Sequence, residues 1–286
     1  MAGATAAFFG YGICQRLLDS SDQGKGVRDV ASRRNDNFER WGRHMFANVY
    51  NWSAMTRLVG AFADPATVLR AVLTKTPLDQ VTVRTPIGPA IIHLRNFESL
   101  KTAFSVFCRR DYPITGDRSH HFLDIGANIG VAATFFLTRH SANTVTCFEP
   151  DSNNLDFLRR NMAQYGDRVR VVAKAVGTEA GGGVLFRSED GKYTSLIEHA
   201  DAAGTETVEI TGFVDILEAA VAETSGDIIL KIDIEGLETA LIKSVDFARY
   251  PRVSRIIVES LECAALIGRP HDRRIRNGYV EDILFR

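Results

Sequence analysis

The alternation of apolar strand-like runs with helix-like segments, from His121 to Ser260, constrains the fold of this chain more than any other feature. The strand-like runs read FLDIG, TVTCFEP, VRVVAKAVG, DIILKIDIEG and SRIIVES. Helical patterns lie between them, at 131–139, 153–165, 213–223 and 237–245. Apolar strands connected through helices are typical of a mostly parallel sheet with both faces covered. The sequence therefore predicts a doubly wound α/β domain over residues 119–286.

Two shorter regions precede this domain. Residues 1–75 carry helical patterns, with a helix expected to begin at Pro65, and are interpreted as a helical N-terminal extension. Residues 76–118 are predicted to form a β-hairpin over 81–94 and a helix over 98–109. Within the domain, the stretch 181–211 interrupts the alternation and is interpreted as an inserted flap or extra strands.

Composition excludes several classes of protein. The 34 Lys and Arg residues balance the 35 Asp and Glu residues, so the net charge of −1 gives no attraction to nucleic acid or an anionic membrane. The four cysteines contain no C-x-x-C pair, which indicates neither a zinc site nor a disulfide framework. The sequence has no uncharged apolar run of about 18 residues that could span a membrane. We therefore expect a cytoplasmic protein with no nucleic-acid or membrane partner and no bound metal.

The first strand of the domain runs into a glycine-containing loop, DIGANIG. Gly126 permits a tight turn, and Gly130 allows a helix to begin close by. A dinucleotide fingerprint would have glycine at the position of Asn128, and Asp124 would repel a pyrophosphate. A carboxylate suits a ligand with a cationic amino group, such as S-adenosylmethionine. The residues expected to bind that cofactor here are Asp124, Gly126, Ala127, Asn128 and Gly130.

A second acid follows the next strand. Glu149 ends the run TVTCFE, 19 residues after Gly130. A carboxylate at this place can accept hydrogen bonds from both ribose hydroxyls of a nucleoside through its two oxygens. Glu149 is therefore a further cofactor-binding candidate.

Charged residues also lie at the end of a later strand, in LKIDIEGLE. Alternation along an extended strand would place Lys231, Asp233 and Glu235 on the same side. Three charges at a strand end are costly unless they face a site or water. We therefore expect these side chains to face the functional site.

Together these segments resemble the FkbM-type methyltransferase family. The matching motifs are DIGANIG at 124–130, FEPDSNNLDFLRRN at 148–161, AVG at 175–177, TSL at 194–196, LKIDIEGLE at 230–238 and IIVES at 256–260. The resemblance implies a Rossmann-like class I methyltransferase fold, S-adenosylmethionine as cofactor and methyl transfer to oxygen. It also adds Pro150, Asn154, Ala175 and Val176 to the expected cofactor-binding residues.

The sequence departs from the family in two places. No counterpart is apparent for residues 1–75. The region after Ser260 looks too short for the antiparallel hairpin that usually ends such domains, because only 278–286 remain. The substrate side would then be altered or completed by another chain, so a homo-oligomer is one expectation.

Methyl transfer to a hydroxyl requires a base near the acceptor. Asp233 is the first candidate, Glu235 the second and Glu259 the third, with Lys231 orienting an acid or polarising the hydroxyl. In a rival interpretation, Asp233, Glu235 and Glu259 hold a divalent cation such as Mg²⁺. Glu238 is interpreted as an N-terminal cap of the following helix.

The sequence thus predicts an S-adenosylmethionine-dependent O-methyltransferase that acts on a small molecule or a sugar hydroxyl. Two alternatives use the same fold: an N-methyltransferase, and a non-catalytic cofactor-binding partner protein. An NAD-dependent oxidoreductase is disfavoured by Asn128.

Overall fold

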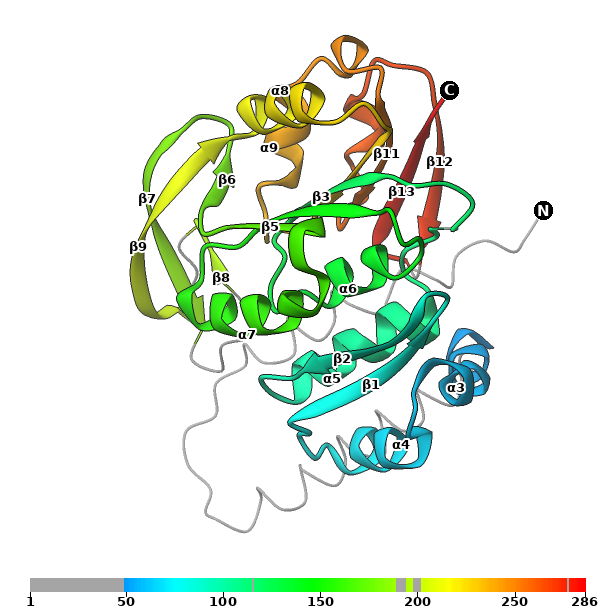
Figure 1. The fold of residues 1–286 in the computed structure, drawn as a ribbon. Coiled ribbons are helices and arrows are strands. Elements are labelled where there is room, and N and C mark those ends of the chain that lie inside the picture. The colour runs from blue at the N-terminus through cyan, green and yellow to red at the C-terminus, as the bar shows by residue number, and fades with distance from the viewer. Residues whose placement is uncertain (1–48, 115, 189–193, 198–201, 277) are drawn as a thin grey trace, which may run out of the picture. The chain divides into compact units, whose positions relative to one another are not determined.

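A computed structural model describes residues 49–286, apart from residues 115, 189–193, 198–201 and 277. Residues 50–286 form one compact unit (Figure 1). Most of the predicted N-terminal extension, residues 1–48, lies outside the described part of the chain. The boundaries predicted at residues 75 and 118 stay predictions.

A seven-stranded sheet forms the centre of this unit. Its strands are β3 (His121–Ile125), β4 (Thr144–Phe148), β5 (Val169–Val172), β10 (Ile228–Ile232), β11 (Val253–Val258), β12 (His271–Arg276) and β13 (Val280–Phe285). The spatial order is β12-β13-β11-β10-β3-β4-β5. The five strands from β11 to β5 pair in parallel, whereas β13 pairs antiparallel with β11 and β12. The predicted mostly parallel α/β sheet is confirmed.

The chain order creates a switch point between β3 and β10. From β3 the chain adds β4 and β5 on one side, and later returns to add β10 and β11 on the other. Asp124 is in register with Lys231 on β10 and with Cys147 on β4. Ligands of doubly wound sheets bind at such a point, beyond the carboxyl ends of the strands.

Helices cover both faces of the sheet. They are α6 (Val131–Leu137), α7 (Ser152–Met162), α8 (Phe213–Glu223) and α9 (Glu238–Lys243). Phe122 on β3 stacks on Phe136 of α6, with ring centroids 4.4 Å apart. The neighbouring residue Leu123 joins a core cluster that includes Phe213 of α8 and Leu241 of α9. Consecutive residues of one strand thus point to opposite faces of the sheet and pack against different helices. This confirms the doubly wound, Rossmann-like arrangement (Figure 1).

The segments before the sheet follow the sequence prediction closely. They are α3 (Val49–Ala61), α4 (Pro65–Thr74), β1 (Gln80–Thr85), β2 (Gly88–His93) and α5 (Phe97–Phe104). Pro65 opens α4, and the side chain of Asp64 accepts a hydrogen bond from the Thr67 amide. β1 and β2 form the predicted antiparallel hairpin. The predicted helix over 98–109 changes to a π-helical turn at Ser105–Arg109, so only its first part is α-helical.

The interruption at 181–211 is a second sheet. It contains β6 (Ala175–Gly177), β9 (Ala202–Gly212), β7 (Gly181–Ser188) and β8 (Thr194–Ser195), in that order. One expectation needs correction here, because the run VRVVAKAVG is not a single strand. Its first half pairs with β4 in the central sheet, whereas Ala175–Gly177 pairs with β9. The run divides because its two halves find different partners.

The C-terminal hairpin also corrects an expectation. β12 and β13 pair over residues 271–285, so the hairpin that looked missing is present. The sequence HDRRIR lacks the apolar pattern of a strand, because β12 lies at the edge of the sheet and its charged side chains form ion pairs. Arg273, for example, pairs at 2.6 Å with Glu281, whose side chain is fully buried. No helix in the described ranges is long and apolar enough to cross a membrane.

Candidate active site

The loop after β3 is shaped by its contact with the β10 loop. Gly126 has a φ of +79°, and a Cβ atom placed on it would lie 1.9 Å from the carbonyl oxygen of Asp233. The amides of Gly126 and Ala127 both donate to the carbonyl of Phe148, at 3.1 and 3.0 Å. Gly126 was expected to bring backbone close to a ligand. In the structure, its missing side chain makes room for the backbone of the neighbouring strand end.

Two further residues of this loop adopt left-handed backbone conformations. Asn128 has a φ of +52°, and its side-chain oxygen accepts a hydrogen bond of 2.7 Å from the Ile129 amide. Gly130 has a φ of +86°, and a Cβ there would lie 2.8 Å from Leu158 and 2.9 Å from Met162. Gly130 therefore permits close packing of the start of α6 against α7, as predicted.

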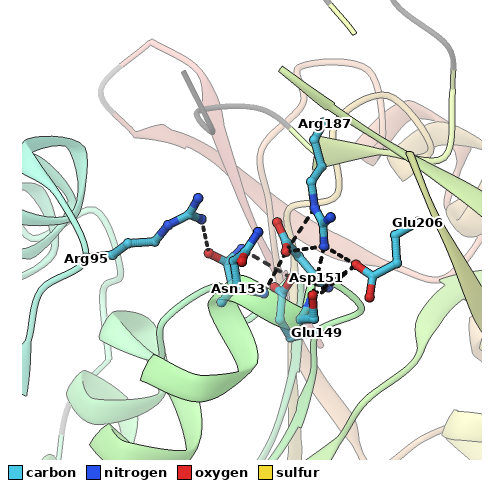
Figure 2. A network of polar contacts seen from close by, with 8 residues as sticks. Arg95, Glu149, Asp151, Asn153, Arg187 and Glu206 are labelled. Carbon is cyan, nitrogen blue, oxygen red and sulfur yellow. Dashed lines mark hydrogen bonds and ion pairs between the residues drawn. The ribbon is translucent and has the colours of Figure 1, made fainter. Parts of the chain in front are cut away.

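Glu149 lies directly after β4, and its side chain is held by main-chain donors (Figure 2). One carboxylate oxygen accepts from the Asn128 amide at 2.7 Å. The other accepts from the Asp151 amide at 3.0 Å and from the Asn154 side chain at 3.3 Å. Burial raises the pKa of Glu149 to about 7, although these hydrogen bonds favour its charged form. Glu149 therefore changes charge close to neutral pH.

Lys231 holds two carboxylates together at the switch point. Its ammonium nitrogen lies 3.1 Å from Asp124 and 3.3 Å from Asp233. It also donates to the carbonyl of Gly126 at 2.6 Å. Asp124 is fully buried, and Lys231 is 4% exposed. Burial disfavours the ammonium, but the two carboxylates raise the pKa of Lys231 well above its ordinary value, so it stays protonated.

Asp233 and Glu259 form a carboxyl pair beside Lys231. Each follows its strand directly, and the Glu259 amide donates to the Ile232 carbonyl at 3.1 Å. Partial burial, the charge of Asp233 and a hydrogen bond between the two side chains raise the pKa of Glu259. Burial works against ionisation of Asp233 too, but Lys231 and the bond from Glu259 hold its pKa below the ordinary value. The two carboxyl groups therefore titrate as an interacting pair in which Glu259 is the harder to ionise.

The two remaining acids of this loop behave differently. β10 ends at Ile232, and Glu235 is exposed in a left-handed turn with a φ of +55°. The expected alternation of three charges therefore holds for Lys231 and Asp233 but not for Glu235, because the strand stops too early. Glu238 is buried, and its carboxylate accepts from the amides of Ile234 and Gly236 at 3.2 and 3.0 Å. Glu238 is the first residue of α9 (Glu238–Lys243), where a negative charge suits the helix N-terminus, but its hydrogen bonds hold the preceding loop and do not cap the amides of the helix.

The structure also brings two tyrosines to this edge that the sequence had not assigned to the site. Tyr112 packs on Phe136, with ring centroids 5.4 Å apart. Its pKa is raised well above normal by burial and by the nearby carboxylates, against the opposing effect of Lys231. Tyr279 belongs to the C-terminal hairpin and donates to Asp111 at 2.8 Å. Neither tyrosine follows a parallel strand, so the strand-end pattern could not identify them.

Two of the residues predicted to bind the cofactor lie in the apolar core. Ala175 and Val176 are buried in two separate apolar clusters. In the described ranges, no group of three or more His, Cys, Asp or Glu side chains is arranged to hold a metal ion. The rival interpretation of Asp233, Glu235 and Glu259 as a Mg²⁺ site stays a prediction.

Comparisons with known proteins indicate the family of this chain. The methyltransferase FkbM domain matches residues 124–272. The 31-O-demethyl-FK506 methyltransferase FkbM of Streptomyces tacrolimicus is 26% identical over 218 residues, covering 65% of this chain and 84% of that protein. The methyltransferase sdnD of Sordaria araneosa is 26% identical over 188 residues, covering 55% and 73%.

Solved structures are more distant. An O-methyltransferase family protein from Burkholderia thailandensis is 12% identical with a TM-score of 0.38, covering 66% of this chain and 56% of that one. A TM-score this low carries no inference about function, and the fold rests on the strand order above. The matched domain spans more than half of the chain and contains the loops after β3, β4, β10 and β11. The chain therefore belongs to the FkbM methyltransferase family.

Proposed function

We propose that this methyltransferase transfers the methyl group of S-adenosylmethionine to a hydroxyl oxygen of a small molecule or sugar. The observation that carries the proposal is the cluster of Lys231, Asp233 and Glu259 beside the Gly126 loop. It supplies a fixed cation and two interacting carboxyl groups, at the edge where a doubly wound sheet binds its ligands.

The residues at this edge fit the proposed cofactor. Glu149 offers two carboxylate oxygens oriented by main-chain donors, and the oxygen held by the Asn128 amide can accept a further hydrogen bond, whereas the other already accepts two. Ribose hydroxyls are donors of the matching kind. Asn154 holds Glu149 in place, which gives it a supporting part in the same site. The fully buried Asp124 contributes negative charge beneath the loop, and Lys231 offsets it.

The chemistry asks little of the protein beyond alignment and proton removal. Bound S-adenosylmethionine supplies a methyl group that is already activated for attack. The acceptor hydroxyl must lose its proton as it attacks, and the carboxylate of Asp233 is the proposed acceptor. Lys231 fixes Asp233 from one side, while Glu259 donates a hydrogen bond to it. Glu235 is exposed and remains the second candidate for the base.

Oxygen is proposed as the acceptor atom because of the carboxyl pair and one relative. The Streptomyces tacrolimicus protein is named for methylation at an oxygen position. An amine needs a base less than a hydroxyl does, because its lone pair is already nucleophilic when the amine is neutral. A carboxylate base held beside a lysine is therefore better suited to a hydroxyl acceptor than to an amine.

The test has two stages. Calorimetry with S-adenosylhomocysteine and with NAD should show binding of the first only. Methyl transfer is then measured with paired acceptors that differ only in carrying a hydroxyl or an amine at the same position. Transfer restricted to the amines, or binding of NAD alone, would overturn the proposal.

A further inference from the structure

Arg187 connects the second sheet to the turn that carries Glu149. It lies on β7, and its guanidinium contacts one carboxylate oxygen of Asp151 through two nitrogens, at 2.8 and 3.2 Å (Figure 2). The same guanidinium lies 3.0 Å from the Ser152 hydroxyl and forms an ion pair with Glu206 on β9. The Arg187 cation therefore pairs with two acids, Asp151 and Glu206, which come from different elements.

Asp151 connects this ion pair with the proposed cofactor site. Its side chain is only 2% exposed, and the oxygen that binds Arg187 also accepts from the Asn153 amide at 2.9 Å at the start of α7. Its own amide donates to Glu149 at 3.0 Å. A nearly buried carboxylate thus lies two residues from Glu149, within a hydrogen-bonded turn. Negative charge at that position makes a second negative charge on Glu149 less favourable.

The charged and titratable groups around Glu149 come from several elements. Asp151 shares its turn, Arg187 comes from β7 and Glu206 from β9. Cys147, on β4, is a fully buried thiol. On the other side, Arg95 donates to the Asn154 amide oxygen at 2.7 Å, and Asn154 donates to Glu149. Arg187 is thus the cation that contacts Asp151 and Glu206, and it acts on Glu149 through Asp151.

We propose that Arg187 is a positioning residue for the cofactor, which offsets the charge of Asp151 and so lets Glu149 ionise at neutral pH to accept the ribose hydroxyls. This inference rests on the proposed function for its cofactor, but its electrostatic part concerns only this chain. It also gives the second sheet a part in the site, since the cation comes from β7.

The consequence is a shift in the titration of Glu149. Its pKa is about 7, raised mainly by burial and also by Asp151. Replacing Arg187 with methionine removes the nearby cation and leaves the acids, so the pKa should rise by about one unit. At pH 7, ionised Glu149 would fall from about half to about one tenth, which weakens cofactor binding about fivefold. At pH 9 the variant and the wild type should bind alike.

Three variants separate this effect from simple loss of a contact. In Arg187→Met the midpoint pH of the Glu149 titration should rise. Adding Asp151→Asn removes the acid but keeps an oxygen at the start of α7, so the midpoint should return toward the wild-type value. Glu206→Gln, the matched control, retains the pair of Arg187 with Asp151 and should cause no upward shift. Arg187→Gln serves as a second uncharged variant, with the same expected shift if Arg187→Met folds poorly.

Two measurements are made on each variant. The pKa of Glu149 is measured without ligand by ¹³C NMR of labelled glutamate carboxyls, with its signal assigned by loss in Glu149→Gln. Binding of S-adenosylhomocysteine is measured by calorimetry from pH 6 to pH 9. An unmoved NMR midpoint in both uncharged variants overturns the inference. A rise that Asp151→Asn does not reverse also overturns it, because the arginine would then act only by attaching the second sheet.

The two proposals fail in different ways. If the NMR midpoints move as expected but the ligand does not bind, the cofactor assignment fails and the effect of Arg187 on Glu149 stands. If the wild type binds the ligand with the expected pH dependence and Arg187→Met behaves identically, the cofactor assignment stands and the inference about Arg187 fails.

Discussion

Replacing Lys231 with methionine tests how far the switch point depends on one buried cation. Methionine keeps most of the length of the side chain but removes its charge. Lys231 is 4% exposed and lies 3.1 Å from Asp124, whose side chain is fully buried. Removing one partner of a buried ion pair costs about 3–5 kcal/mol, because the remaining charge is left in a medium that solvates it poorly. The Gly126 carbonyl also loses a 2.6 Å hydrogen bond.

We therefore expect the free energy of unfolding of Lys231→Met to fall by about 3–5 kcal/mol at pH 7. For a domain of this size this corresponds to a melting temperature about 6–20 °C lower. Burial already raises the pKa of Asp124 against the lowering effect of Lys231, so it should rise further above its unfolded value of about 3.9 once the lysine is removed. A buried acid of raised pKa destabilises the fold as pH rises through its unfolded pKa. The deficit should therefore shrink as pH falls from 7 toward the unfolded pKa of about 3.9, and it should be largely gone below about pH 4.

Denaturant unfolding at pH 5 and pH 7 measures both effects. The matched control is the double variant Lys231→Met with Asp124→Asn, which removes the buried charge and should recover much of the lost stability. A loss below about 1 kcal/mol, or a double variant no more stable than the single one, would refute the argument that Lys231 compensates Asp124.

Three further predictions concern the site. Asp233→Asn should lower methyl transfer about 10²–10⁴-fold while the calorimetric affinity for S-adenosylhomocysteine changes little; activity within about threefold would assign Asp233 a structural part. Glu149→Gln should weaken that affinity by about 1.5–3 kcal/mol at pH 8 and remove its increase through about pH 7, since the amide cannot ionise; an unchanged pH profile would exclude Glu149 as the ribose acid. Glu238→Ala should lower the free energy of unfolding by about 0.5–1.5 kcal/mol without changing that affinity, because the amides of Ile234 and Gly236 lose their acceptor, and an equal loss of both would contradict this structural role.

The sequence predicted the parallel sheet well because its signals are local. Each parallel strand of the central sheet is an apolar run, and helical patterns follow β3, β4 and β10. The positions of Glu149, Asp233 and Glu259 follow from the same pattern, because each acid comes directly after a strand. Since parallel strands end at a common edge, the order of residues along the chain was sufficient to bring these acids together.

The errors arose where pairing between distant segments decides the structure. Whether 169–177 forms one strand depends on β9, which follows much later in the chain. The strand at 271–276 is polar because ion pairs and an edge position replace apolar packing. Glu235 left the expected face because β10 ends three residues before it. The network of Arg187 could not be predicted either, since β7 reaches Asp151 only through the fold of the second sheet.

The same contacts stabilise the fold and shape the site. Lys231 offsets the buried Asp124, yet it also orients Asp233, so its loss would lower activity through either effect. Gly126 accommodates the backbone of Asp233, so a side chain there would displace the proposed base. Loss of activity at Lys231 or Gly126 is therefore weak evidence for catalysis. Asp233 is about one third exposed, whereas Lys231 and Asp124 are buried, so a change at Asp233 should disturb the fold less and report more directly on the chemistry.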